Sequence, residues 1–107
     1  DFLHVQDVAR ANVLAMQAET SDECFNVGAG TRTTINELVH KLLRLTGSNL
    51  EPEYHPQEHI FVTHRLGSTD KAERLLGFKA AIPLDQGLAS VVAWRRQDQA
   101  SSYRKSA

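Results

Sequence analysis

The feature that most constrains the fold of this chain is the amphipathic stretch that starts at Thr34. Thr34 and Glu37 have the spacing of a capping box, in which each side chain bonds an otherwise unpaired backbone amide of the other residue. A wide apolar stripe follows, made of Ile35, Leu38, Val39, Leu42, Leu43 and Leu45. Gly47 suits the residue just past a helix end. The stretch therefore predicts a helix that begins at Thr34 and ends before Gly47.

The residues before this helix alternate between strand and helix patterns. Residues 2–5 are few and rich in β-forming side chains, which is typical of a strand that leads into a helix start at Gln6 and Asp7. Residues 8–18 change to helical spacing, with apolar or small side chains every three or four positions. Residues 24–27 form another short apolar run of the length of a buried strand. The order predicted here is strand, helix, strand.

Two further helices are predicted in the second half of the chain. Residues 60–62 have the composition of one more short strand. Ser68 can cap a short helix that stops at Gly77, and Pro83 suits the start of a last helix that runs to Trp94. The residues after Trp94 look like a fraying polar tail. The predicted fold class is α/β, with a mixed β-α-β-α arrangement followed by two helices.

The composition fits one small globular domain and excludes several functions. The 107 residues carry 12 basic and 13 acidic side chains, a net charge of -1, so the chain has no general attraction for nucleic acid or an anionic membrane. Cys24 is the single cysteine, which excludes an intrachain disulfide and a thiolate zinc cage. No apolar run approaches the roughly 18 to 20 residues of a membrane span. We expect a cytoplasmic protein, and the start at Asp1 without a methionine suggests a piece of a longer one.

Two interpretations of the turn formed by Gly28, Ala29 and Gly30 stay open. Glycine lets backbone amides approach a ligand, and a helix N-terminus follows at Thr34, so the turn has some features of a phosphate-binding loop. The third glycine of the dinucleotide fingerprint is missing, however, and the helix begins later than that fingerprint requires. An ordinary tight turn between a strand and a helix is the favoured interpretation.

The sequence predicts neither a metal site nor a catalytic residue. His55 and His59 have the four-residue spacing of two ligands on a helix face, but Pro56 lies between them and argues against a helix. No glutamate follows His55, as a zinc-protease motif requires. No serine, threonine or cysteine is framed by a recognisable base and an orienting partner.

Three side chains are candidates for binding an anionic substrate. Arg65 lies just before the helix expected at Ser68, and a guanidinium can hold a phosphate through paired hydrogen bonds. A helix N-terminus adds favourable partial charge for an anion. His64 and Arg32 stand behind Arg65 as candidates. The alternative that both arginines are solvated surface charges stays open.

Several short motifs occur in an informative order. Residues 1–11, DFLHVQDVARA, run from an Asp-aromatic-apolar-His-Val segment into a helix. Residues 25–30, FNVGAG, are followed by TTINEL at 33–38. Residues 67–78 read GSTDKAERLLGF, and PLDQGL opens the segment 83–94. Together these motifs resemble the late strands and the closing helices of the extended short-chain dehydrogenase/reductase family, in the family's order and over nearly the whole chain.

The resemblance implies the C-terminal fragment of an extended Rossmann-type enzyme. Residues 1–30 would form a late strand-helix-strand edge of the parent's sheet, residues 31–100 the lobe that binds a nucleotide sugar, and residues 101–107 a polar tail. The family binds NAD(P) through an N-terminal Gly-rich turn and uses a Tyr-x-x-x-Lys pair with a serine or threonine. None of these is in this chain, so the resemblance places the cofactor mainly outside it, and the chain alone is not expected to be catalytic.

The activity implied by the resemblance is that of an NAD-dependent nucleotide-sugar epimerase, similar to UDP-glucose 4-epimerase, or of a dehydratase. The parent would be a homodimer, and its partner would be the nucleotide-sugar substrate. Arg65 would contact the diphosphate, with His64 and Arg32 as further candidates. The family often carries an acidic residue where Ser68 stands. The alternative function is a stand-alone, non-catalytic module that binds a nucleotide or a protein.

Overall fold

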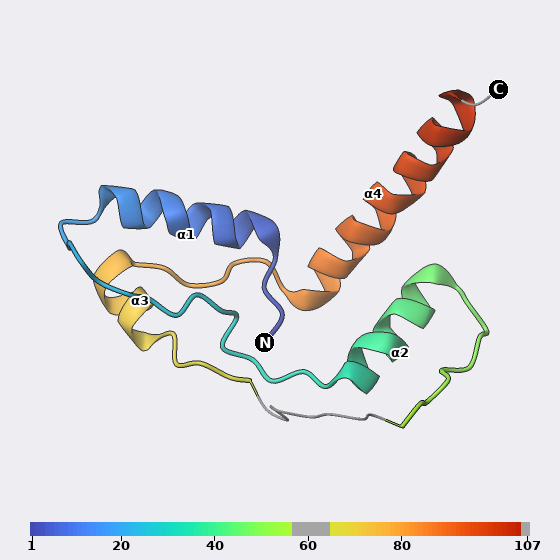
Figure 1. Cartoon of the computed structure of the whole chain (residues 1–107), viewed down its shortest axis with the longest axis horizontal. Helices are drawn as coiled ribbons and strands as arrows, with labels where there is room; N and C mark the ends of the chain where they lie inside the picture. The colour runs from blue at the N-terminus through green and yellow to red at the C-terminus, as the bar shows by residue number, and fades with distance from the viewer. Residues whose placement is uncertain (57–64, 106–107) are drawn as a thin grey trace.

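The computed structural model describes residues 1–56 and 65–105, and it forms four helices there in two packed pairs (Figure 1). The helices are α1 (Val5–Gln17), α2 (Ile35–Thr46), α3 (Asp70–Leu76) and α4 (Leu84–Lys105). α1 packs against α3, and α2 packs against α4. The radius of gyration is 17.7 Å, whereas a compact domain of about 100 residues has ~13 Å. The chain is therefore spread out, and α4 projects away from α1 and α3 (Figure 1).

No β-strand forms among residues 1–56 and 65–105, so the expected β-α-β-α order is not confirmed. Residues 2–5 and 24–27 have the composition of strands, but a strand also needs the backbone donors and acceptors of a neighbouring strand. Neither segment finds such a neighbour within the described residues. The third expected strand, at 60–62, lies outside them.

α1 begins earlier than the sequence indicates, because His4 is its N-cap. The His4 backbone is extended, with φ -71° and ψ 141°, and its Nδ1 atom accepts a hydrogen bond from the Gln6 N–H at 3.3 Å. A side-chain acceptor at this position satisfies one of the unpaired amides of the first turn. Val5 is therefore helical, although the sequence predicts that the strand extends through it.

Both ends of α2 form as the sequence predicts. The Glu37 N–H donates to Thr34 Oγ1 at 3.1 Å, and the Thr34 N–H donates to the Glu37 carboxylate at 2.6 Å, which completes the capping box. The backbone hydrogen bond from Thr34, followed by the one from its hydroxyl, holds the pKa of Glu37 below its ordinary value. Gly47 has a left-handed backbone with φ 67°, and its N–H donates to the Arg44 carbonyl at 3.2 Å.

The buried core lies between α1 and α3. Its buried members are Ala11, Ala72, Leu76 and Phe78. Phe78 follows α3 directly and has no exposed surface, and the Arg10 guanidinium lies 5.0 Å from the centre of its ring. One aromatic side chain therefore supplies the largest apolar contact area in this core.

α3 begins slightly later than predicted. Thr69 is the N-cap and makes no capping hydrogen bond through its side chain, whereas Ser68 Oγ accepts from the Asp70 N–H at 3.3 Å. The helix ends as expected at Gly77, whose backbone is left-handed with φ 65°. Ser68 thus supports the start of α3 from one residue before the cap position.

Asp7 is a buried carboxylate that joins α1 to the segment leading into α4. The side chain accepts hydrogen bonds from Arg10 Nη2 at 2.8 Å and from the N–H groups of Ala81 and Ile82 at 3.1 Å and 3.0 Å. Only 1% of Asp7 is exposed. Burial raises the pKa of Asp7, but the hydrogen bonds from Arg10, Ile82 and Ala81 outweigh it and hold the pKa below its ordinary value. Asp7 is therefore ionised at neutral pH and fully bonded.

α4 is longer than predicted, because the helix continues to Lys105 instead of fraying after Trp94. Neither glycine nor proline occurs after Gly87, so nothing in the sequence stops the helix there. Arg95 and Asp98, three residues apart, form an ion pair at 3.0 Å on its surface. None of the four described helices combines the length and the apolar character needed to cross a membrane.

Candidate functional site

Arg65 lies at a hollow of about 300 Å³ that forms where residues 25–28 meet residues 65–69. The hollow is lined by Asp1, Phe25, Asn26, Val27, Gly28, Arg65, Leu66, Gly67 and Thr69. These residues come from three separate stretches of the chain. The site is therefore assembled by tertiary contacts, and no single motif contains it.

The glycine turn closes one side of this hollow by binding Asp1. The N–H groups of Ala29 and Gly30 donate to the two carboxylate oxygens of Asp1 at 2.8 Å and 3.2 Å. A Cβ atom on Gly28 would collide with the same carboxylate, so a larger residue there would displace the Asp1 side chain from its present position. The amides that a phosphate cradle would use are thus occupied by a side chain of the protein itself, which supports the interpretation as a structural turn.

Lys71 fixes the other side of the hollow to α3. Its Nζ atom donates to the Cys24 carbonyl at 2.9 Å and to the Glu23 carboxylate at 2.6 Å. The same ammonium lies 5.0 Å from the centre of the Phe25 ring, which adds a cation-π contact. The segment that carries Phe25 is therefore held against the start of α3.

The structure describes two of the three residues proposed from the sequence, Arg65 and Arg32, and only Arg65 lines the hollow. Arg65 is exposed and lines the hollow, and within the described residues no acidic side chain lies within ion-pair distance of its guanidinium. Arg32 is exposed in the segment before α2 and is not among the lining residues. His64 lies outside the described residues. Arg65 is thus the candidate that the fold brings to the hollow.

Asn26 and Asp1 also belong to the hollow, and the sequence did not identify either as a site residue. Asn26 Nδ2 donates to the Ser68 carbonyl at 3.3 Å. Asn26 occurs in the FNVGAG motif, which is one of the motifs that carry the family resemblance. No spacing rule, however, pairs residue 26 with residue 68. Their proximity arises only from the fold.

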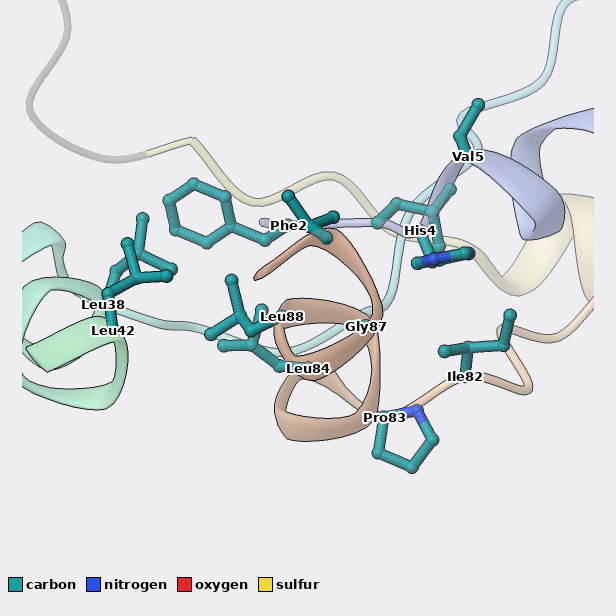
Figure 2. A pocket seen from close by; sticks show the side chains of 12 residues that line it. Phe2, His4, Val5, Leu38, Leu42, Ile82, Pro83, Leu84, Gly87 and Leu88 are labelled. Carbon is teal, nitrogen blue, oxygen red and sulfur yellow. The ribbon is translucent and has the colours of Figure 1, made fainter. Parts of the chain in front are cut away.

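A second, larger hollow of about 400 Å³ lies between α2, the start of α4 and the N-terminal segment (Figure 2). Apolar side chains dominate its lining, among them Phe2, Leu38, Leu42, Leu84, Leu88 and Val91. His4 is the titratable side chain among the lining residues, and its Nε2 atom lies 3.1 Å from Ser90 Oγ. The other ring nitrogen accepts from Gln6, so both are engaged. This hollow suits an apolar occupant and offers no cation for a phosphate.

The described residues do not gather metal ligands. Among them, no three side chains of His, Cys, Asp or Glu lie close enough together to hold a metal ion. His40 bonds the Asn36 carbonyl at 2.7 Å, and His55 lies 3.3 Å from the Glu53 carboxylate at the surface. His59, the other half of the spacing considered in the sequence, lies outside the described residues.

Comparison with known proteins finds relatives among enzymes that are named for nucleotide sugars. No family model matches the sequence. The chain is 34% identical over 107 residues to the dTDP-glucose 4,6-dehydratase of an Actinoplanes species, an alignment that covers 92% of this chain and 31% of that protein.

Solved structures extend the similarity to the fold. The UDP-glucose 4-epimerase of Thermotoga maritima, solved with UDP-glucose, is 36% identical with a TM-score of 0.88, over 92% of this chain and 32% of that one. The Bordetella bronchiseptica enzyme WbmF, solved with NAD+ and UDP, is 31% identical with a TM-score of 0.82, over 97% of this chain and 31% of that one. The chain thus spans 31% to 32% of the length of these three proteins.

Proposed function

The chain belongs to the extended short-chain dehydrogenase/reductase family of nucleotide-sugar epimerases and dehydratases, and on that premise we propose that it is the substrate-binding part of an NAD-dependent epimerase. A UDP-glucose 4-epimerase-like activity is the preferred assignment, with a dehydratase as the other member of the family. The relatives solved with UDP-glucose and with UDP support a nucleotide sugar as the substrate class.

The cofactor and the catalytic groups are proposed to belong to other parts of the enzyme. We propose that the described residues form no NAD site of their own, an interpretation supported by the Asp1 carboxylate, which accepts hydrogen bonds from the amides of the glycine turn. Neither Tyr54 nor Tyr103 is followed by a lysine four residues later. We propose that this chain by itself binds substrate without turning it over. A homodimeric, cytoplasmic enzyme is proposed from the sequence and the family resemblance.

The exposed Arg65 guanidinium at the 300 Å³ hollow is the observation that carries the proposal. A guanidinium binds the two oxygens of a phosphate through parallel hydrogen bonds, and the described residues leave Arg65 free of an acidic partner. The nearby Asp1 carboxylate would repel a diphosphate, but two backbone amides already bind it and reduce that repulsion. The hollow is therefore suited to the diphosphate end of a nucleotide sugar.

The test is to replace Arg65 in the full-length enzyme that carries this chain. A charge-assisted hydrogen bond is worth roughly 1.5 to 3 kcal/mol, so Arg65→Ala should weaken binding of the nucleoside diphosphate by about tenfold or more. Arg65→Lys should recover part of the loss, because lysine keeps the charge but not the paired geometry. Calorimetric titration with UDP, dTDP and GDP measures the affinities, and a parallel titration with NAD should show no change.

Arg74→Ala is the matched control, because it removes the same charge from an exposed position on α3. An Arg32→Ala variant shows whether that second candidate contributes. If Arg65→Ala and Arg74→Ala bind the nucleoside diphosphate equally well, Arg65 is a solvated surface charge and this role is wrong.

A further inference from the structure

We infer that Asn26 is a positioning residue that holds Arg65 at the hollow, an inference that rests on the proposed role of Arg65 in binding the diphosphate. The Asn26 amide donates to the Ser68 carbonyl at 3.3 Å, three residues after Arg65 in the chain. Asn26 and Arg65 line the same hollow. Within the described residues no hydrogen bond joins the two side chains directly, so Asn26 acts on Arg65 through the backbone.

Gly67 shows how closely this backbone lies against Asn26. A Cβ atom added to Gly67 would stand 3.4 Å from both Cγ and Nδ2 of Asn26. The separation is van der Waals contact, with no room for another group between the amide and the chain. The link from Arg65 to Ser68 therefore runs directly over the Asn26 side chain.

The neighbouring anchors hold other points of the backbone than Asn26 does. Lys71 fixes the Cys24 carbonyl to α3, on the far side of Ser68 from Arg65. The amino group of Asp1 donates to the Arg65 carbonyl at 3.4 Å, a hydrogen bond about as long as the one from Asn26 to Ser68 at 3.3 Å. The Asp1 amino group therefore restrains the backbone at Arg65 itself, and the Asn26 amide is the side-chain group that restrains it between Arg65 and α3. A restrained arginine loses less conformational freedom when a phosphate binds, which strengthens binding without a new contact.

A double-mutant cycle tests this inference in the full-length enzyme. The variants are Asn26→Ala, Arg65→Ala and the double replacement, each titrated with whichever of UDP, dTDP and GDP binds the unmodified enzyme most tightly. The loss of one ordinary hydrogen bond predicts that Asn26→Ala alone weakens binding by about twofold to tenfold. In the Arg65→Ala background the same replacement should have no further effect, because the group that it positions is gone.

Two variants complete the design. Asn49→Ala makes the same chemical change at an exposed position after α2 and should leave affinity unchanged. Asn26→Gln keeps an amide donor on a longer arm and should recover part of the loss. Far-ultraviolet circular dichroism checks the fold of each variant, and an Asn26→Ala protein that is unfolded would make Asn26 a structural residue and overturn the inference.

The outcomes distinguish this inference from the proposed function. If Arg65→Ala leaves nucleoside diphosphate affinity intact, the role of Arg65 itself is wrong. If Arg65→Ala weakens binding while Asn26→Ala does not, or if Asn26→Ala weakens binding equally in both backgrounds, Arg65 keeps its role and only the positioning by Asn26 is refuted.

Discussion

The region around α1 and α3 differs from the region around α2 and α4 in how it is stabilised. In the first, Phe78 has no exposed surface and only 1% of Asp7 is exposed. In the second, α2 packs against α4 but has no buried residue, and both helices line a hollow of about 400 Å³ together with the N-terminal segment (Figure 2). The first region thus has a buried core, whereas the second has a hollow lined mainly by apolar side chains.

The helix with the stronger capping signals, α2, lies in the region without a buried core, and the helix with the weaker ones, α3, lies in the region with it. α2 has a complete capping box and a left-handed glycine at its end. α3 has seven residues and an N-cap without a side-chain hydrogen bond, yet Ala72 and Leu76 on it are buried. Short helices are marginal without tertiary packing. α2 is therefore stabilised largely from within its own sequence, and α3 by the core that it joins.

The largest effect is expected at Phe78, the centre of the closed region. Phe78→Ala should reduce the free energy of unfolding by about 3 to 5 kcal/mol, because it leaves a cavity among fully packed neighbours. Leu88→Ala is the control in the open region, where the half-buried side chain should cost about 1 to 2 kcal/mol. Urea unfolding followed by circular dichroism measures both. Equal losses would show that the open hollow is as tightly packed as the core and would remove the contrast.

Asp7 should give the next largest effect and a characteristic pH dependence. Asp7→Asn replaces an acceptor of several hydrogen bonds by an amide that turns a donor toward other donors, a change worth about 1 to 3 kcal/mol. The pKa of Asp7 is lowered in the folded protein, so its contribution is complete above the unfolded pKa of about 3.9 and is lost as the pH falls through the lower folded pKa.

Unfolding measured between neutral and strongly acidic pH separates Asp7 from a carboxylate of the open region. The Asp7→Asn variant should lose less stability than the unmodified protein on acidification. Asp85→Asn is the matched control, because its exposed carboxylate pairs with Lys41 at 2.6 Å and a surface pair contributes about 0 to 1 kcal/mol. If the two variants respond to acid alike, the buried network does not stabilise the ionised form of Asp7.

The smallest effect is expected at the capping box of α2. Thr34→Ala should cost about 0.5 to 2 kcal/mol, because the Glu37 amide loses its acceptor. Thr34→Ser keeps the hydroxyl and should cost less, and Thr31→Ala is a control outside the cap. Urea unfolding gives the three midpoints. An unchanged midpoint for Thr34→Ala would mean that the open region depends on tertiary contacts after all.

Several relations between residues close in sequence were predicted correctly. The capping box of Thr34 and Glu37, the helix end at Gly47 and the helix end at Gly77 all form as expected. Each depends on hydrogen bonds between residues a few positions apart, so the residue types and their spacing carry the information. Arg65 was also selected from its local position, and the fold places it at a hollow, while its proposed contact with a diphosphate stays a prediction.

Two expected strands failed because they needed partners distant in sequence, whereas the starts of α1 and α3 and the end of α4 differed from the prediction over local signals. Residues 2–5 and 24–27 have strand composition but find no pairing strand within the described residues, and the strand expected through Val5 gave way to the His4 cap. The burial of Asp7 depends on amides 74 and 75 residues away, and Asn26 meets Ser68 across 42 residues. The sequence by itself determined the capping box of α2, the helix ends at Gly47 and Gly77, and the absence of a Tyr-x-x-x-Lys pair. Only the tertiary structure decided which groups are buried and which meet Arg65, because burial and pairing arise when distant segments pack together.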